Sequence, residues 1–175
     1  TYMNNVYEKV FESNNIVFVK INEKLINEYL DLVNTPSIQD LVNSKRKVIS
    51  LEKELEWIKS KIENNDYVFS MLEKDTNMFI GNVELMDYDG ESAELAISIT
   101  EGMQNKHYGQ EAITTMINYA FNVLGLEQLN AVVFSHNERS LHCLEKYGFV
   151  KYKEVKNVKQ LNEKEIDDVY LNLIG

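Results

Sequence analysis

Residues 92–124 constrain the fold more than any other part of the chain, because a strand, a short polar loop and a helix follow one another directly. Every second residue of 93–99 is apolar, which is the period of a strand with one buried face. Apolar residues then recur at helical spacing from Ala112 to Leu124, and Gly125 ends the helix. A loop that opens a helix presents unpaired backbone N–H groups and about half a positive charge. This loop is therefore suited to hold a phosphate group.

The other segments have the pattern of a mixed α and β domain. Helix patterns with one apolar side follow Asn22 and Ser50, which are good N-cap residues, and a shorter helix is predicted over 138–147. Pro36 lies in a predicted loop, and the charged segment 156–164 is predicted to be an exposed hairpin loop. Strand patterns occupy six further segments: 16–21, 67–72, 78–86, 129–134, 149–155 and 168–174. The order of the middle strands favours an antiparallel meander.

Length and composition indicate a single domain, residues 1–175, because 44% of the residues are hydrophobic and can form one sizeable core. No stretch reaches the ~18–20 apolar residues of a membrane span, and Thr1–Asn5 lack the residue order of a signal peptide. We therefore expect a soluble, cytoplasmic protein without a membrane partner. Cys143 is the one cysteine, and no Cys/His cluster has metal-ligand spacing, which argues against an internal disulfide, a metal site and redox chemistry.

The net charge of −10 argues against a nucleic-acid partner, because phosphate contacts need clustered lysine and arginine. An acidic chain suits a cationic substrate. The same acidity also keeps a protein soluble without any role in binding, so charge alone leaves both interpretations open.

Two motifs carry a family resemblance: the loop Gln104–Gly109, and the segments Asn137–Ser140 and Lys146–Phe149 that follow one strand later. Together with the element order, they resemble the GCN5-related N-acetyltransferase (GNAT) superfamily, in particular the branch with the ribosomal-protein alanine N-acetyltransferases. The resemblance covers nearly the whole chain. It implies an α+β fold with a mixed, mainly antiparallel central sheet of about seven strands, flanked by about four helices.

The resemblance also implies that the chain binds acetyl-CoA and releases CoA. In such enzymes the loop wraps the pyrophosphate, the exposed edge of the preceding strand bonds the pantetheine amides, and an asparagine bonds the pantetheine arm from the other side. Carried onto this chain, the implied cofactor-binding residues are Ile97, Ser98, Ile99, Gln104, Asn105, Lys106, His107, Tyr108, Gly109, Gln110, Asn137 and Ser140.

His107 departs from the family loop, which normally has glycine at this position. With a negative φ, its N–H can still donate and its imidazole can touch a phosphate. With a positive φ, strain of about 1–3 kcal/mol results. A histidine that only faces solvent is the alternative.

The implied reaction is attack by a neutral amine on a thioester, and an amine with a pKa of about 10.4 must first lose a proton. Glu94 is the preferred base because it lies on the strand that lines the cleft, and Glu84 is second; both can also be plain solvent-facing residues. Many family members place a tyrosine acid where this chain has Leu144. Ser140 is then the candidate donor to the thiolate, or else a helix-capping serine.

The sequence thus predicts an acetyl-CoA-dependent N-acetyltransferase that acts directly on a primary amine in a ternary complex. The acceptor can be a protein N-terminus, an amino acid, a polyamine or an amino-bearing antibiotic. A GNAT-fold module that binds acyl-CoA or another ligand without efficient catalysis is the alternative, because His107 and Leu144 both depart from the motif. Either form is expected as a monomer or homodimer.

Overall fold

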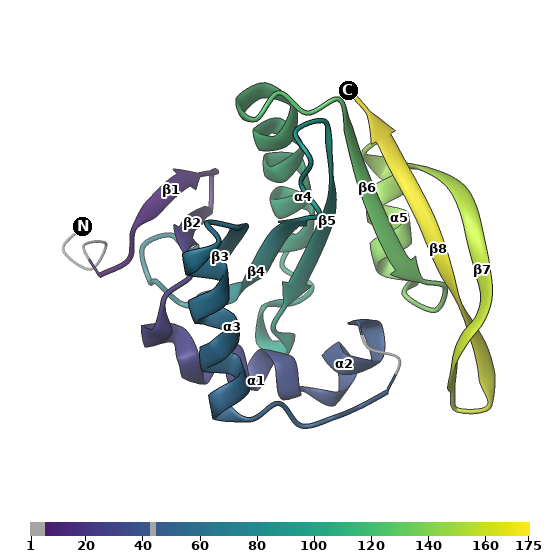
Figure 1. Ribbon diagram of the computed structural model, residues 1–175, viewed down its shortest axis with the longest axis horizontal. Helices are drawn as coiled ribbons and strands as arrows, with labels where there is room; N and C mark the ends of the chain where they lie inside the picture. Colours follow the sequence, from purple (N-terminus) through teal and green to yellow (C-terminus); the bar gives the residue numbers. More distant parts are fainter. Residues whose placement is uncertain (1–5, 43–44) are drawn as a thin grey trace.

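The computed structural model describes residues 6–42 and 45–175, apart from the side chain of Asn157 (Figure 1). The expectation about Thr1–Asn5 lies outside the described residues. Eight strands form one sheet in the order β1-β2-β3-β4-β5-β6-β8-β7. They are β1 (Lys9–Glu12), β2 (Ile16–Lys20), β3 (Tyr67–Glu73), β4 (Phe79–Met86), β5 (Ser92–Ile99), β6 (Gln128–Phe134), β7 (Val150–Leu161) and β8 (Lys164–Ile174).

Helices lie on both faces of the sheet. The α-helices are α1 (Ile26–Asn34), α2 (Pro36–Val42), α3 (Leu51–Glu63), α4 (Tyr108–Asn118) and α5 (Glu138–Lys146). Short 3₁₀ helices η2 (Glu23–Leu25) and η3 (Glu101–Met103) precede α1 and α4, and a π-helical turn η4 (Tyr119–Val123) extends α4. The predicted caps of the early helices are confirmed, because Asn22 accepts from Lys24 N and Ser50 accepts from Lys53 N.

The sheet is antiparallel except for the pair β5 and β6, which runs parallel. This pair has three register partners, from Ser92 opposite Gln128 to Glu94 opposite Asn130. Beyond Glu94 the two strands diverge, while β5 stays paired with β4 as far as Ile99. The residues Leu95–Ile99 therefore have a strand partner on one side only. We call their unpaired side the free edge of β5.

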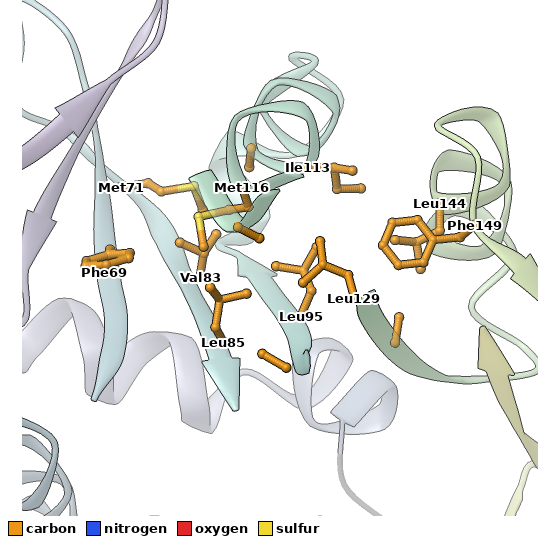
Figure 2. Close-up of a cluster of buried hydrophobic side chains, with 14 of the residues drawn as sticks. Phe69, Met71, Val83, Leu85, Leu95, Ile113, Met116, Leu129, Leu144 and Phe149 are labelled. Carbon is orange, nitrogen blue, oxygen red and sulfur yellow. The ribbon is translucent and has the colours of Figure 1, made fainter. Parts of the chain in front are cut away.

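The main core lies between the sheet and helices α4 and α5, on what we call the α4 face. Figure 2 shows its side chains converging between the strands and α4, among them Met71, Val83, Leu95, Met116 and Leu129. Leu144 and Phe149 extend the same core toward α5. The opposite face, which we call the α1 face, packs α1 and α3 through a second cluster that includes Tyr29, Ile58 and Val68.

The α+β architecture predicted from the sequence is confirmed, with three differences in detail. The sheet has eight strands because Lys9–Glu12 adds an edge strand that is too short to give a clear alternating pattern. The predicted loop after Pro36 is the helix α2, since proline is favoured at a first helical position. The predicted loop 156–164 is mostly strand, with a turn at Asn162 and Glu163, where φ is +51° and +66°.

Candidate active site

The free edge of β5 is the first part of the site. Thr100 N donates to Ile80 O at 2.9 Å, so the backbone groups of Thr100 point toward β4. The Ser98 carbonyl points the same way, since its oxygen would lie 1.9 Å from a Cβ added to Gly81. Because backbone groups alternate along a strand, those of Ile97 and Ile99 point into the gap beside β6. Of the three edge residues predicted, Ser98 therefore does not present its backbone there.

The loop after β5 is the second part. Gln104 closes the end of the free edge, because its side-chain Nε2 donates to Ile99 O at 3.0 Å. The six consecutive backbone N–H groups of residues 105–110 then donate to no acceptor among the described residues. Three of them are the first N–H groups of α4, where the helix dipole adds positive potential. Such a run of donors forms an anion-binding site.

His107 has the left-handed backbone conformation that glycine usually supplies, with φ of +68° and ψ of +9°. Asn105 is also left-handed, with φ of +61°, while Lys106 and Tyr108 are not. Alternation in the sign of φ turns successive N–H groups toward one side and makes a concave nest for an anion. His107 thus keeps the shape of the loop in spite of its side chain. Histidine is among the residue types enriched in this conformation.

Gly109 leaves space that the protein itself does not fill. Its φ is not positive, so the turn does not require glycine. Outside its own helix backbone and chain neighbours, a Cβ added here would meet one described atom, Ile99 Cδ1, at an ordinary 3.5 Å. That direction is toward the free edge of β5. A glycine that packing does not require, next to unpaired N–H groups, fits the close approach of a ligand.

Side chains fix the start of α4 to the rest of the sheet. Tyr108 donates its hydroxyl hydrogen to Glu73 on β3, and this bond raises the pKa of Tyr108 to about 12. Asn15 donates to Glu111 from both its backbone N and its Nδ2, each at 2.8 Å. Burial opposes ionisation of Glu111, but the bonds from Ser13 and Asn15 outweigh it and lower its pKa. The donor loop is therefore held rigidly.

Glu94 lies where β5 and β6 separate, on the α1 face of the sheet. Its neighbours Ala93 and Leu95 are buried on the opposite face, which confirms the alternation read from the sequence. Burial raises the pKa of Glu94, and the Asp87 carboxylate raises it further. The carboxylate accepts no hydrogen bond from the described residues. A half-buried carboxylate with a raised pKa is suited to accept a proton near neutral pH.

Glu84, the second base candidate, is engaged with a neighbour. Its Oε2 accepts from Lys61 Nζ at 2.5 Å, and both side chains are about one-fifth exposed (17% and 22%). Burial lowers the pKa of Lys61, but Glu84 and Asp66 outweigh that effect and raise it. The Glu84 carboxylate is therefore occupied by a cation, whereas Glu94 has no such partner among the described residues. The structure therefore separates two candidates that the sequence left similar.

The second motif forms the start of α5. Asn137 is the N-cap, and its Oδ1 accepts from Ser140 N at 3.3 Å. The N-cap of α5 is thus Asn137 and not Ser140, whose backbone N–H is the donor in this bond. The Ser140 hydroxyl makes no hydrogen bond within the described residues. Leu144, which stands at the usual tyrosine position, is 4% exposed and belongs to the core. Ser140 remains the available hydroxyl of this motif.

Three contacts of this region were not predicted from the sequence. Gln110 Oε1 accepts from Tyr147 Oη at 3.2 Å and from Lys146 Nζ at 3.4 Å, which ties α4 to α5. His136 stacks on Phe134 at the end of β6, and neither of its buried ring nitrogens makes a hydrogen bond with a described residue. Burial and then Lys159 lower the pKa of His136, and the neighbouring Asp40 opposes them more weakly.

The remaining chemistry-bearing residues do not form a separate centre. Cys143 packs partly buried against the core, and burial raises the pKa of its thiol, as expected for a packing residue. Within residues 6–42 and 45–175, no group of His, Cys, Asp and Glu is arranged to hold a metal ion. No helix in the same ranges is long and apolar enough to cross a membrane.

A model of the acetyltransferase (GNAT) domain family matches residues 15–150. This chain belongs to that family. Over 181 aligned residues it is 25% identical to an N-acetyltransferase 9-like protein from Nematostella vectensis, a match that covers 95% of this chain and 90% of that protein. It is 26% identical over 105 residues to the SPbeta prophage-derived uncharacterized N-acetyltransferase YokL of Bacillus subtilis (strain 168), and that match spans 59% of each protein.

A solved structure shares the fold. The spermidine N-acetyltransferase from Vibrio cholerae, in complex with CoA and spermine, matches with a TM-score of 0.81 and 21% identity, over 93% of this chain and 96% of that one. The GNAT resemblance noted in the sequence is therefore confirmed, and family membership makes the chain an acyltransferase.

Proposed function

We propose that this GNAT protein moves an acetyl group from acetyl-CoA to a primary amine, and releases CoA. The observation that carries the proposal is the run of six unpaired N–H groups in residues 105–110, next to the free edge of β5. The pyrophosphate of the cofactor needs clustered donors, and its pantetheine amides need a strand edge. Both kinds of group lie side by side here.

In this proposal the backbone holds the cofactor. Residues 105–110 bind the pyrophosphate, with Gly109 allowing close approach. Ile97 and Ile99 bond the pantetheine amides as a neighbouring strand would. Gln104 contributes by fixing the end of the edge, and Asn137 contributes its side-chain N–H₂, because its Oδ1 already caps α5.

The reaction then takes place near the point where β5 and β6 separate. Glu94 accepts a proton from the acceptor's ammonium group, directly or through water. The neutral nitrogen attacks the thioester carbonyl, so a C–N bond forms and the C–S bond breaks. The attacking nitrogen loses its second proton as the amide forms, and this proton passes to the leaving thiolate, which the Ser140 hydroxyl stabilises by donating a hydrogen bond. Glu84 stays ion-paired with Lys61 and shapes the α1 face rather than the chemistry.

Calorimetry with acetyl-CoA, followed by measurement of free CoA thiol with a panel of amines, tests this proposal. Spermidine, an aminoglycoside and short peptides with free N-termini represent the acceptor classes. We expect binding and amine-dependent thiol release. No binding at millimolar acetyl-CoA would rule the proposal out, and binding without thiol release would favour the alternative of a non-catalytic acyl-CoA module. A cytoplasmic monomer or homodimer remains the expected form.

A further inference from the structure

Glu54 on α3 is a buried acid with an unsatisfied oxygen. Its residue is 4% exposed, and its buried Oε2 accepts no hydrogen bond from any described residue. By contrast, the carboxylate of Glu84 has Lys61 beside it, and that of Asp40 has Arg46. Burying a carboxylate without a partner is unfavourable, so a side chain of this kind indicates a group that arrives from outside the chain.

Helix geometry directs Glu54 toward the sheet. Glu54, Ile58 and Lys61 lie one above another on α3, at spacings of four and three residues. Ile58 belongs to the cluster on the α1 face, and Lys61 reaches Glu84 on β4. The side chain of Glu54 thus lies on the stripe that faces the sheet, about 10 Å along the helix from Lys61.

The strand below it places this carboxyl near the open part of the sheet. A short turn joins α3 to β3, and β3 is antiparallel to β4, so α3 runs in about the same sense as β4. Seven residues of helix correspond to about three residues of strand. Counting back three residues from Glu84 brings Glu54 to the level of Gly81, next to Asn82. The register partners of Gly81 and Asn82 are Ile99 and Ser98, on the β5 segment that has diverged from β6.

Polar groups replace apolar packing at the same level of the α1 face. Tyr29 Oη lies 2.5 Å from Ser70 Oγ, and Ser70 Oγ lies 2.9 Å from Asn82 Oδ1. Ser70 is completely buried and pairs with Asn82 across the strands. A row of hydrogen-bonding side chains therefore runs from α1 to the neighbour of Ser98, which suits a polar ligand rather than an apolar one.

We infer that Glu54 binds an ammonium group of a cationic amine acceptor and thereby sets the preference of the enzyme for alkylammonium substrates. The inference rests on the proposed function and deepens it. Glu54 takes no part in bond making; it holds an ammonium group of the acceptor other than the one from which Glu94 accepts a proton. Burial alone raises the pKa of Glu54, as expected for a carboxyl that awaits its cation.

The test uses the variant Glu54→Gln, which keeps the shape and removes the charge. Glu52→Gln is the matched control, because Glu52 lies exposed on the same helix. The thermal midpoint is measured with millimolar spermidine and with propylamine, both with and without saturating CoA. Acetyl transfer to both amines is followed by thiol release, and acetyl-CoA affinity is followed by calorimetry.

We expect spermidine, which has further ammonium groups, to raise the midpoint of the wild type and of Glu52→Gln more than propylamine does, and Glu54→Gln to lose most of this difference. Its KM for spermidine should rise at least tenfold, with unchanged acetyl-CoA affinity. Equal amine responses in wild type and Glu54→Gln, or no response in the wild type, would overturn the inference while acetyl-CoA binding still supports the proposed function. Lack of acetyl-CoA binding removes the proposed function instead, and the shift measured without CoA still decides the role of Glu54.

Discussion

The two sides of the candidate site use different chemistry. The cofactor side consists of backbone groups: six N–H donors of residues 105–110 and the free edge of β5. The α1 side consists of ionisable side chains: Glu94 and Glu54 have no hydrogen-bond partner within residues 6–42 and 45–175, while Glu84 has Lys61. Backbone groups suit a ligand that never changes, whereas side chains can be exchanged without altering the fold. The comparison predicts that substitutions on the two sides affect different measurements.

The largest expected effect is that of Glu94→Gln on catalysis. In the proposed mechanism, loss of the general base lowers kcat/KM by about 10²–10⁴-fold, while acetyl-CoA affinity stays unchanged because the proposed cofactor contacts come from the backbone. The wild-type rate should rise with pH through the raised pKa of Glu94, and the variant should lack this rise. Thiol-release kinetics across pH check both points. A variant within threefold of wild type would show that another group is the base.

Gly109→Val should give the opposite pattern on the cofactor side. A side chain here meets Ile99 Cδ1 and then enters the space beside the unpaired N–H groups. We expect the Kd for acetyl-CoA to rise at least tenfold, while the pH dependence of the remaining activity keeps its shape. Calorimetry measures the affinity, and circular dichroism verifies the fold. Gly109→Ala serves as a milder step; unchanged affinity in both variants would contradict the proposed position of the pyrophosphate.

Glu84→Gln should affect stability more than catalysis. The change removes one partner of Lys61, whose remaining ion pair among the described residues is with Asp66 at 3.7 Å. Loss of a half-buried charged hydrogen bond lowers the free energy of unfolding by about 1–2 kcal/mol. Urea unfolding measures this loss, and kcat should stay within a few fold of wild type. A fall in kcat comparable to that of Glu94→Gln would remove the distinction between the two glutamates.

Glu54→Gln should raise stability by about 1–2 kcal/mol at neutral pH, since it removes an unsatisfied buried acid. The pKa of Glu54 is higher in the folded protein than in the unfolded chain. Its destabilising effect is therefore complete above the folded pKa and disappears as pH falls through both values. Urea midpoints of wild type and variant should converge on acidification. A constant difference at every pH would mean that the effect is packing rather than charge.

His107→Gly should have the smallest effect. Relief of the left-handed strain is partly offset by the greater freedom of glycine in the unfolded chain, so the net gain stays within about 1 kcal/mol. Acetyl-CoA affinity should improve by a few fold at most. His107→Val should instead lose about 1–3 kcal/mol, because a β-branched residue tolerates positive φ poorly. Equal stability of the two variants in urea would contradict the inferred backbone strain at position 107.

The sequence predicted the strand, the loop and the helix start of the proposed cofactor side, because these elements follow from local patterns. Alternation over 93–99, a loop and a helix start are local features, and the donors of residues 105–110 follow from them. The α1 side depends on contacts between distant residues. Nothing near Glu84 in the sequence indicates Lys61, which is 23 positions away. The lack of a hydrogen-bond partner for Glu54 Oε2 among the described residues is likewise visible only in the folded structure, because the burial of Glu54 depends on how α3 packs.

The short contact between β5 and β6 has a mechanical consequence. Within the described residues, strands β1–β5 are paired to strands β6–β8 through three register pairs, which lie where β5 and β6 begin. The two halves of the sheet are joined along this short contact, and the core around Met116, between the sheet and α4, packs against both of them. A cofactor bound in the gap would contact both halves of the sheet and restrain their relative motion. Amide exchange should then slow on β6 as well as in the loop when acetyl-CoA binds.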